Sequence, residues 1–168
     1  MTNNSSPILL ESLKRLDMKL YRSKPHGNCF FSSLSKYFNL SNNTQGTAKD
    51  IRKNVIQFIK ENQYVFDYIS NVAGMTPNEI DDDLYELRQQ GVYDLDIFDV
   101  LPVIIATQYN IKLCIYTWIE LSDQYITKKD MEMYLPIKYQ GNNIKRNLNE
   151  ISLLYSNLEH YDLLYPLN

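Results

Sequence analysis

The chain has 168 residues, a length that suits one compact domain with its own hydrophobic core. Hydrophobic residues make up 44% and charged residues 22%, as is usual for a globular protein in water, and the formal net charge is −3. This balance excludes a broad basic surface and argues against a nucleic-acid partner. We therefore expect a single domain over residues 1–168, with the polar residues 1–6 disordered.

The sequence carries no sign of export or membrane insertion. The first residues lack a basic segment followed by an apolar stretch, and no apolar run approaches the length of a transmembrane helix. The two cysteines, Cys29 and Cys114, lie far apart, and together with two histidines they match no familiar zinc pattern. A domain of this size does not need a disulfide. We expect a cytoplasmic monomer that uses no metal and no cofactor and binds no membrane.

The composition also bears on the source. Tyrosine, asparagine, isoleucine and lysine are abundant, as in proteins encoded by AT-rich genomes. Intracellular parasites, symbionts and viruses often have such genomes, and for a protein from one of them the expected location is the host cytosol.

Helical signals come first along the chain. Pro7 and three leucines at helical spacing predict a short amphipathic helix. Residues 19–22 are expected to be extended, and residues 23–28 to form a loop because they contain proline and glycine. Apolar residues then recur at every fourth position, so a helix is predicted over residues 29–38, with Cys29 in its first turn.

Three more helical signals follow. Thr47 can cap a helix over residues 48–61. The expected buried stripe of that helix is Ile51, Val55, Phe58 and Ile59. A shorter helix is expected over residues 66–70. The Thr76-Pro77 pair then predicts a helix that reaches about Gln90 and stops at Gly91.

The spacing of apolar residues changes in the last third of the chain. Residues 96–109 look helical, with a kink or a new helix start at Pro102. Alternating patterns then predict strands over residues 111–119, 133–139, 150–155 and 160–165, the second of them weakened by Pro136. Cys114, out of phase with its apolar neighbours, is expected to be a structural thiol. Helices followed by a run of strands predict an α+β fold, with a small central sheet packed between helices.

Cys29 is the first candidate for chemistry. A thiol attacks as its thiolate, and the unpaired N–H groups and dipole at a helix start favour an anion. Gly27 and Asn28, just before it, allow a backbone path that can aim several N–H groups at one point, as in an oxyanion hole. The alternative is a small buried hydrophobe, which is the commoner role of a cysteine at a helix start.

A thiol nucleophile needs a base, and the chain contains only two histidines. His26 lies in the loop shortly before Cys29. His160 begins the last predicted strand, where His160 and Asp162 point to the same face, so that Asp162 can orient the imidazole. The alternative is that His160 and Asp162 form an ordinary surface polar pair.

Taken together, these segments resemble the ovarian tumour (OTU) family of cysteine deubiquitinases. The family's nucleophile box, Asp-Gly-Asn-Cys and then an aromatic or Leu, is similar to residues 24–31, Lys-Pro-His-Gly-Asn-Cys-Phe-Phe. Its C-terminal box of His, an aromatic and then Asp or Asn is similar to residues 160–162, His-Tyr-Asp. Residues 91–96 resemble the family's glycine–aromatic–acidic segment before a helix, and the order of elements through residues 111–116 agrees. The resemblance spans about residues 18–166.

The resemblance implies a papain-like OTU fold and hydrolysis of isopeptide or peptide bonds at the C-terminus of ubiquitin through a thioester. Cys29 would be the nucleophile, His160 the base, and Asp162 the residue that fixes the histidine tautomer. The loop of His26, Gly27 and Asn28 would hold the oxyanion. The implied partners are ubiquitin, polyubiquitin chains or ubiquitin-like modifiers, with an effector role for a pathogen protein.

The resemblance also implies a narrow channel for the Gly-Gly tail of ubiquitin. Tyr161 would wall one side, and Val92, Tyr93 and Asp94 the other. Because that tail is basic, Asp94, Asp96 and the acidic run 81–83 are candidates for contacting it, although solvation is the simpler explanation for these acids.

One position departs from the family pattern, because His26 stands where the family has Asp. If that Asp only shapes the loop, His26 can do the same with a different hydrogen bond. If its charge matters, we expect low activity or altered specificity. A third option is that His26 adds positive charge beside Cys29 and favours the thiolate.

Three functions compete on these grounds. The first is an active deubiquitinase. The second, which the His26 departure favours, is a weak or inactive OTU-fold module that binds ubiquitin. The third is an unrelated cysteine hydrolase or acyltransferase with the same triad, since a fold does not determine a substrate.

Overall fold

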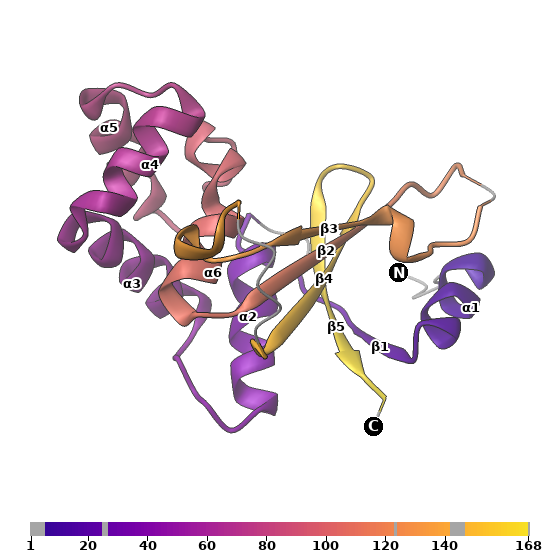
Figure 1. Cartoon of the computed structure of the whole chain (residues 1–168). Helices are drawn as coiled ribbons and strands as arrows, with labels where there is room; N and C mark the ends of the chain where they lie inside the picture. The colour runs from indigo at the N-terminus through magenta and orange to yellow at the C-terminus, as the bar shows by residue number, and fades with distance from the viewer. Residues whose placement is uncertain (1–5, 25–26, 123, 142–146, 168) are drawn as a thin grey trace.

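The central element of the protein is a twisted five-stranded sheet (Figure 1). The structure is a computed structural model that describes residues 6–24, 27–122, 124–141 and 147–167. Within these segments the α-helices are α1 (Pro7–Arg15), α2 (Cys29–Leu40), α3 (Ala48–Glu61), α4 (Gln63–Ala73), α5 (Pro77–Leu87) and α6 (Leu101–Tyr109). The strands are β1 (Met18–Tyr21), β2 (Lys112–Trp118), β3 (Met131–Tyr134), β4 (Glu150–Ser156) and β5 (His160–Pro166). Short 3-10 helices are η1 (Asp96–Asp99), η2 (Lys128–Asp130) and η3 (Ile137–Tyr139).

The strands lie side by side in the order β1-β5-β4-β2-β3, so that β1 and β3 form the two edges. β2 and β4 are parallel, and the other neighbouring pairs are antiparallel. Most helices precede most strands along the chain. The predicted α+β class, with a sheet packed between helices, is therefore confirmed.

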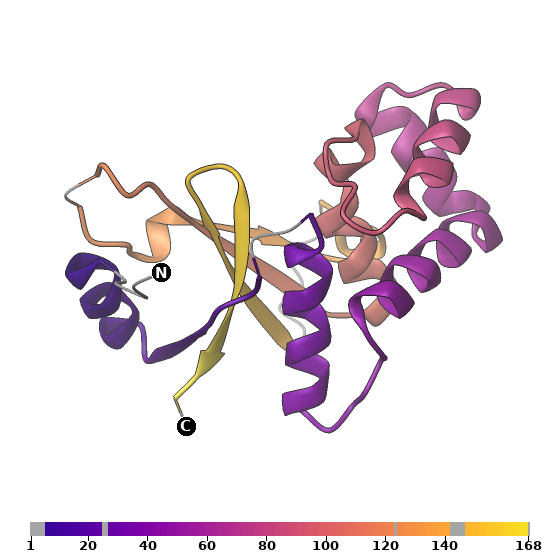
Figure 2. The ribbon, with the colours of Figure 1, turned by 180° about the vertical axis from the view of Figure 1, so that it is seen from behind.

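Both faces of the sheet are buried, which explains the pattern of β2. Leu113 and Ile115 join the larger hydrophobic cluster, to which α2 to α6 contribute. Cys114, Tyr116 and Trp118 point to the other face and join a smaller cluster beneath α1. Figures 1 and 2 show α1 and the group α3–α5 at opposite ends of the molecule, with the sheet between them. Cys114 is thus a buried thiol, and burial raises its pKa to about 12.

The helix starts predicted at Thr47 and Thr76 are confirmed. Thr47 forms a capping box with Asp50 at the start of α3, and Thr76 forms one with Glu79 at the start of α5. Pro102 lies in the first turn of α6, directly after η1, so that a new helix begins there rather than a kinked one continuing.

Some predicted boundaries are wrong. The strand expected over residues 133–139 is β3, which begins at Met131 and ends at Tyr134. Pro136 has no N–H to donate to a neighbouring strand, and the chain turns into η3 directly after it. The short helix expected over residues 66–70 is the longer α4. No helix among the described residues is both long and apolar enough to cross a bilayer.

The end of α5 also differs from the prediction, and both local and tertiary hydrogen bonds account for it. The helix ends at Leu87 instead of near Gln90. Its last turn tightens, because the Arg88 N–H donates to the Tyr85 carbonyl and the Gln89 N–H to the Glu86 carbonyl. A helix that reached Gln90 would also need a hydrogen bond from the Gly91 N–H to the Leu87 carbonyl. The structure gives each group another partner: the carbonyl accepts from Arg52, and the N–H donates to Asn28.

We expect Thr47→Ala to lower the free energy of unfolding by about 1 kcal/mol, because the Thr47 hydroxyl accepts the Asp50 N–H at the start of α3. Denaturant unfolding followed by circular dichroism measures the change. Thr44→Ala, in the exposed loop before this helix, is the matched control and should change the free energy by less than about 0.5 kcal/mol. Equal losses in the two variants would contradict the capping role.

Candidate active site

Cys29 is the first residue of α2, as the sequence predicted. The carbonyl of Asn28, the N-cap residue, accepts the first helical hydrogen bond from the Ser32 N–H at 2.8 Å. The N–H groups of Asn28 and Cys29 have no hydrogen-bond acceptor within the described part of the chain. Cys29 therefore lies where a helix start leaves N–H groups available to an anion.

The sulfur of Cys29 lies against the last strand. Its Sγ accepts a hydrogen bond from the Tyr161 N–H at 3.4 Å. The β1–β5 ladder ends at the pair Tyr21–Leu163, so that Tyr161 lies on an open stretch of the β5 edge and its N–H is available to the sulfur. Figure 2 shows α2 standing beside this part of the sheet, and α2 contacts β5 directly.

His160 and Asp162 project from the same face of β5, as expected for residues two apart on a strand. His160 Nε2 lies 2.9 Å from Asp162 Oδ1. The Asp162 side chain is buried, and its Oδ1 also accepts the backbone N–H of Ser23 at 2.7 Å. Asp162 therefore holds one ring nitrogen of His160 and leaves Nδ1 for Cys29.

The three side chains are also coupled electrostatically. Hydrogen bonds to Asp162 and then to Cys29 raise the pKa of His160 from its ordinary 6.5 to about 10. The imidazole is therefore protonated at neutral pH, and a positive ring beside a sulfur stabilises a thiolate. The arrangement brings a nucleophile and a proton donor to one point.

The loop before Cys29 is tied to the turn that follows α5. Asn28 Oδ1 accepts the Gly91 N–H at 3.1 Å, and Asn28 Nδ2 donates to Gln90 Oε1 at 3.0 Å. Gly27 packs so closely on this turn that a Cβ would lie 1.7 Å from the Gly91 carbonyl oxygen, so that only glycine fits there. His26, predicted to belong to the same loop, lies outside the described residues.

Arg52, which the sequence patterns did not single out, lies beneath this loop with 1% of its surface exposed. Its Nε donates to Asn28 Oδ1 at 2.9 Å, its Nη2 to the Gly27 carbonyl at 2.8 Å, and its Nη1 to the Leu87 carbonyl at 3.2 Å. The guanidinium also stacks over the Phe31 ring at 4.5 Å. Burial lowers the pKa of Arg52 to about 10, so that it stays charged at neutral pH.

Helical spacing was the signal that could have revealed Arg52. In α3 the buried positions include Ile51, Val55, Ile56 and Ile59, and Arg52 lies on the same stripe. An arginine inside an apolar stripe is unusual, because a buried charge is costly unless it is well bonded.

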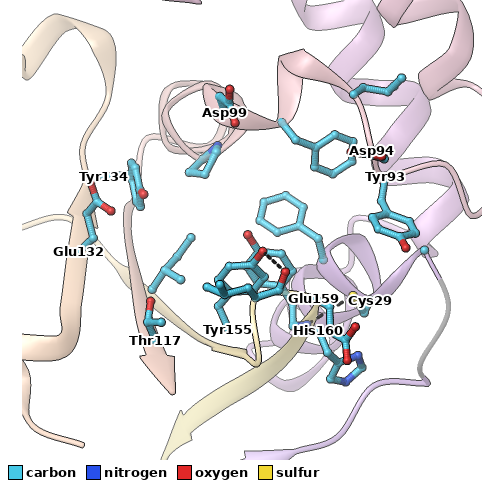
Figure 3. Close-up of a pocket in the computed structure, with 18 residues that line it drawn as sticks. Cys29, Tyr93, Asp94, Asp99, Thr117, Glu132, Tyr134, Tyr155, Glu159 and His160 are labelled. Carbon is cyan, nitrogen blue, oxygen red and sulfur yellow. Dashed lines mark hydrogen bonds between the residues drawn. The ribbon is translucent and has the colours of Figure 1, made fainter. Parts of the chain in front are cut away.

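Cys29 and His160 open onto a groove of about 690 Å³ (Figure 3). Tyr161 forms part of its wall, with its ring stacked on Tyr155 at 4.4 Å and edge-on to Phe30 at 5.1 Å. Of the other residues predicted to line a channel, Tyr93 and Asp94 do so, whereas Val92 is not part of the lining.

The groove is acidic. It is lined by four carboxylate side chains, those of Asp94, Asp99, Glu132 and Glu159, and apart from His160 its described lining contains no basic residue. Figure 3 shows Glu132 at the far end of the groove from Cys29. Asp96 and the run 81–83, also considered as contacts for a basic tail, do not line the groove. No group of three or more His, Cys, Asp or Glu among the described residues could hold a metal ion.

Comparison with known proteins gives a match by structure and none by sequence. No protein-family model and no curated protein matches the chain. Among solved structures, the OTU domain of OTUD1 superposes with a TM-score of 0.69 at 14% identity, over 92% of this chain and 90% of that one.

Two further structures are similar over most of both chains. The viral OTU domain protease from Qalyub virus has a TM-score of 0.64 at 17% identity, over 90% of this chain and 86% of that one. An OTU deubiquitinase from Wolbachia pipientis wMel, solved bound to ubiquitin, has a TM-score of 0.60 at 14% identity, over 90% of this chain and 98% of that one. The chain therefore has the OTU fold.

We expect Asp162→Asn to bring the pKa of His160 down from about 10 toward 6.5, because it removes the carboxylate that contributes most to the rise. NMR titration of the imidazole signals measures this, and comparison with His26→Ala assigns the two histidines. Asp67→Asn, on the exposed surface of α4, is the control and should leave the titration unchanged.

The same contact makes a prediction about stability. Because folding raises the pKa of His160, the contact stabilises the folded state fully below about pH 6.5, and this contribution disappears as the pH rises through about 10. If His160 titrates near 6.5 in the unaltered protein, the coupling described above is wrong.

Proposed function

We propose that this protein is a cysteine-dependent deubiquitinase, which hydrolyses isopeptide or peptide bonds at the C-terminus of ubiquitin. The observation that carries the proposal is the arrangement of Cys29, His160 and Asp162 at the end of an acidic groove in an OTU fold. The proposed roles are nucleophile for Cys29, proton carrier for His160, and orienting residue for Asp162.

The proposed reaction has two steps. The Cys29 thiolate attacks the terminal carbonyl carbon of ubiquitin and forms a C–S bond, while the charge moves to the carbonyl oxygen. The C–N bond then breaks, and the leaving lysine amine takes the proton of His160. Water attacks the resulting thioester and gives one proton to His160, and the C–S bond breaks to release the thiolate. The carboxylic acid formed loses its remaining proton to solvent, which restores the carboxylate of ubiquitin. Asp162 keeps the imidazole in the orientation that both transfers need.

The free N–H groups beside Cys29 suit the oxyanion. Asn28 and Cys29 carry N–H groups without an acceptor in the described chain, directly beside the sulfur. Donors aimed at a developing negative charge lower the barrier more than donors that must reorient. We assign the oxyanion to this loop, of which His26, Gly27 and Asn28 are the proposed members.

The groove suits the substrate tail in shape and charge. The last residues of ubiquitin are extended, basic and end in Gly-Gly, and the groove that leads to Cys29 carries four carboxylates. Aromatic side chains of Tyr161 and Tyr93 flank the end that would hold the two glycines. The Wolbachia and Hazara virus OTU proteins of similar fold have both been solved bound to ubiquitin, which supports ubiquitin as the partner of this chain.

The proposal extends to the setting of the reaction. We propose that residues 1–168 form a single catalytic domain that acts as a monomer on ubiquitin or polyubiquitin chains. Its proposed location is the cytoplasm, or the host cytosol as an effector for a pathogen or symbiont protein.

A ubiquitin probe with an electrophilic C-terminus tests the chemistry directly. The unaltered protein should form a covalent adduct at Cys29, and Cys29→Ala should form none. Cys114→Ala is the matched control and should still be labelled, because Cys114 is buried in the other face of the sheet. His160→Ala should lower kcat for ubiquitin release by about 10²- to 10⁴-fold, as expected on loss of a general acid and base.

Two results would favour the other functions. Tight binding of ubiquitin without labelling would support a module that binds ubiquitin and does not cleave it. Neither binding nor labelling, together with acyl transfer from another donor, would support an unrelated cysteine hydrolase or acyltransferase. A harmless His160→Ala would show that the base is assigned wrongly.

Charge reversal in the groove tests the direction of substrate entry. We expect Glu132→Lys to raise KM for a ubiquitin substrate by about 5- to 50-fold with a smaller change in kcat, because the repulsion acts on the tail and not on the reacting carbonyl. Glu86→Lys on the exposed surface of α5 changes the net charge equally and is the control. An equal rise in KM for both variants would mean that only the net charge of the protein matters.

A further inference from the structure

Arg52 is a buried cation without a carboxylate partner among the described residues. Its three hydrogen bonds go to neutral acceptors: two backbone carbonyls and one amide oxygen. With 1% of its surface exposed it is almost fully removed from water. A buried charge of this kind is costly, and replacing it with an apolar group is often neutral or stabilising. Stability alone therefore gives a poor reason for an arginine at this position.

The hydrogen bond from Arg52 to the Gly27 carbonyl determines the direction of the next N–H group in the chain. No peptide bond in the described chain is cis, so the Gly27–Asn28 peptide has its carbonyl and its N–H pointing in opposite directions. Arg52 Nη2 holds the Gly27 carbonyl at 2.8 Å on the inner side of the loop. The Asn28 N–H, which has no acceptor in the described chain, is therefore turned away from Arg52 and toward the outer side of the loop, where Gly27 and Cys29 line the groove.

The other two hydrogen bonds of Arg52 hold the turn after α5, against which the loop packs. Arg52 Nη1 donates to the Leu87 carbonyl. Asn28 Oδ1 accepts hydrogen bonds from Arg52 Nε and from the Gly91 N–H. These bonds hold the turn after α5, on which Gly27 packs at Gly91. One guanidinium therefore holds the oxyanion loop and the turn against which this loop lies.

We propose that Arg52 is a positioning residue for the reaction, which orients the Asn28 N–H toward the oxyanion through its fork of bonds to Gly27, Asn28 and Leu87. The inference rests on the proposed cysteine chemistry. Lysine keeps the charge but has a single ammonium that cannot reproduce a planar fork with three acceptors. Charge and geometry are therefore separable by experiment.

Two reactions at Cys29 distinguish the reactivity of the thiolate from the stabilisation of the oxyanion, and neither needs ubiquitin. Alkylation by iodoacetamide is a displacement at carbon that depends on the thiolate and develops no oxyanion. Acylation by a nitrophenyl ester depends on the same thiolate and passes through an oxyanion, with nitrophenolate as the leaving group. The ratio of the acylation rate to the alkylation rate therefore reports on the oxyanion donors alone.

In Arg52→Lys we expect the acylation rate to fall by about 10- to 100-fold and the alkylation rate to change by less than about threefold, because loss of a full oxyanion donor costs about 10²- to 10³-fold. In a ubiquitin substrate the same loss should appear in kcat with KM nearly unchanged. Lys53→Met, which removes an exposed cation from the next position on α3, is the control and should leave both rates unchanged.

Arg52→Met tests folding, because methionine fills much of the same space without the charge. Thermal unfolding of each variant shows whether it is folded at the assay temperature, and rates are compared only for folded protein. A folded Arg52→Met with an unchanged acylation-to-alkylation ratio would overturn the inference, as would equal losses in both reactions for Arg52→Lys. If the unaltered protein fails to label with the ubiquitin probe but shows the expected ester ratios, the proposed substrate is wrong and the role of Arg52 stands.

Discussion

The packing of α2 against β5 is the constraint on which the candidate site depends. α2 buries Phe30, Phe31, Leu34 and Phe38, and each such side chain contributes about 1.5–3 kcal/mol by leaving water. That packing places the helix start, with Cys29, against the edge of a strand more than a hundred residues later in the chain. Because the β1–β5 ladder stops short of Tyr161, the edge has room for the sulfur. The catalytic arrangement we propose thus follows from where one helix is buried and where one strand pairing ends.

The polar part of the site consists of buried groups that have few alternative hydrogen-bond partners. Asp162 has only 2% of its surface exposed, and one of its oxygens is shared by His160 and the Ser23 backbone. Arg52 is buried to a similar degree on the other side of Cys29, bonded to carbonyl and amide oxygens. In a medium of low polarity such groups keep their partners firmly, because an unpaired one would be costly. The site is therefore rigid on both sides of the nucleophile, which is what preorganised donors require.

The groove leads from the candidate site toward β3. Cys29 and His160 lie at one end, and carboxylates line the path toward β3. The stacked pair of Tyr155 and Tyr161 connects the groove wall to the strand that carries His160. In the proposed function, a basic tail that enters from the side of β3 would pass Glu132 before it reaches Cys29. The groove wall and the strand that carries His160 are thus joined directly through β4 and β5.

Local signals in the sequence determined much of the fold. The capping residues Thr47 and Thr76, the repeat of apolar residues after Cys29, and the alternation in the last two strands each depend on neighbours within a few positions, and each predicted its element correctly. The spacing of His160 and Asp162 likewise placed them on one face of a strand before any contact was known. The strand predicted over residues 133–139 was misplaced because the effect of Pro136 depends on the neighbouring strand. Pro136 has no N–H to donate to that strand, and β3 ends before it, at Tyr134.

Only the tertiary structure decided how the loop before Cys29 is held. Its anchors come from α3 and from the turn after α5, and no local pattern joins Gly27 to Gly91 or Arg52 to Leu87. Partners distant in sequence likewise prevent a helical bond between Gly91 and Leu87, so that α5 does not continue to Gln90. The sequence by itself thus determined which residues could carry the chemistry, since helix starts and strand faces are local properties. The structure decided what orients them, since that depends on contacts between segments far apart in the chain.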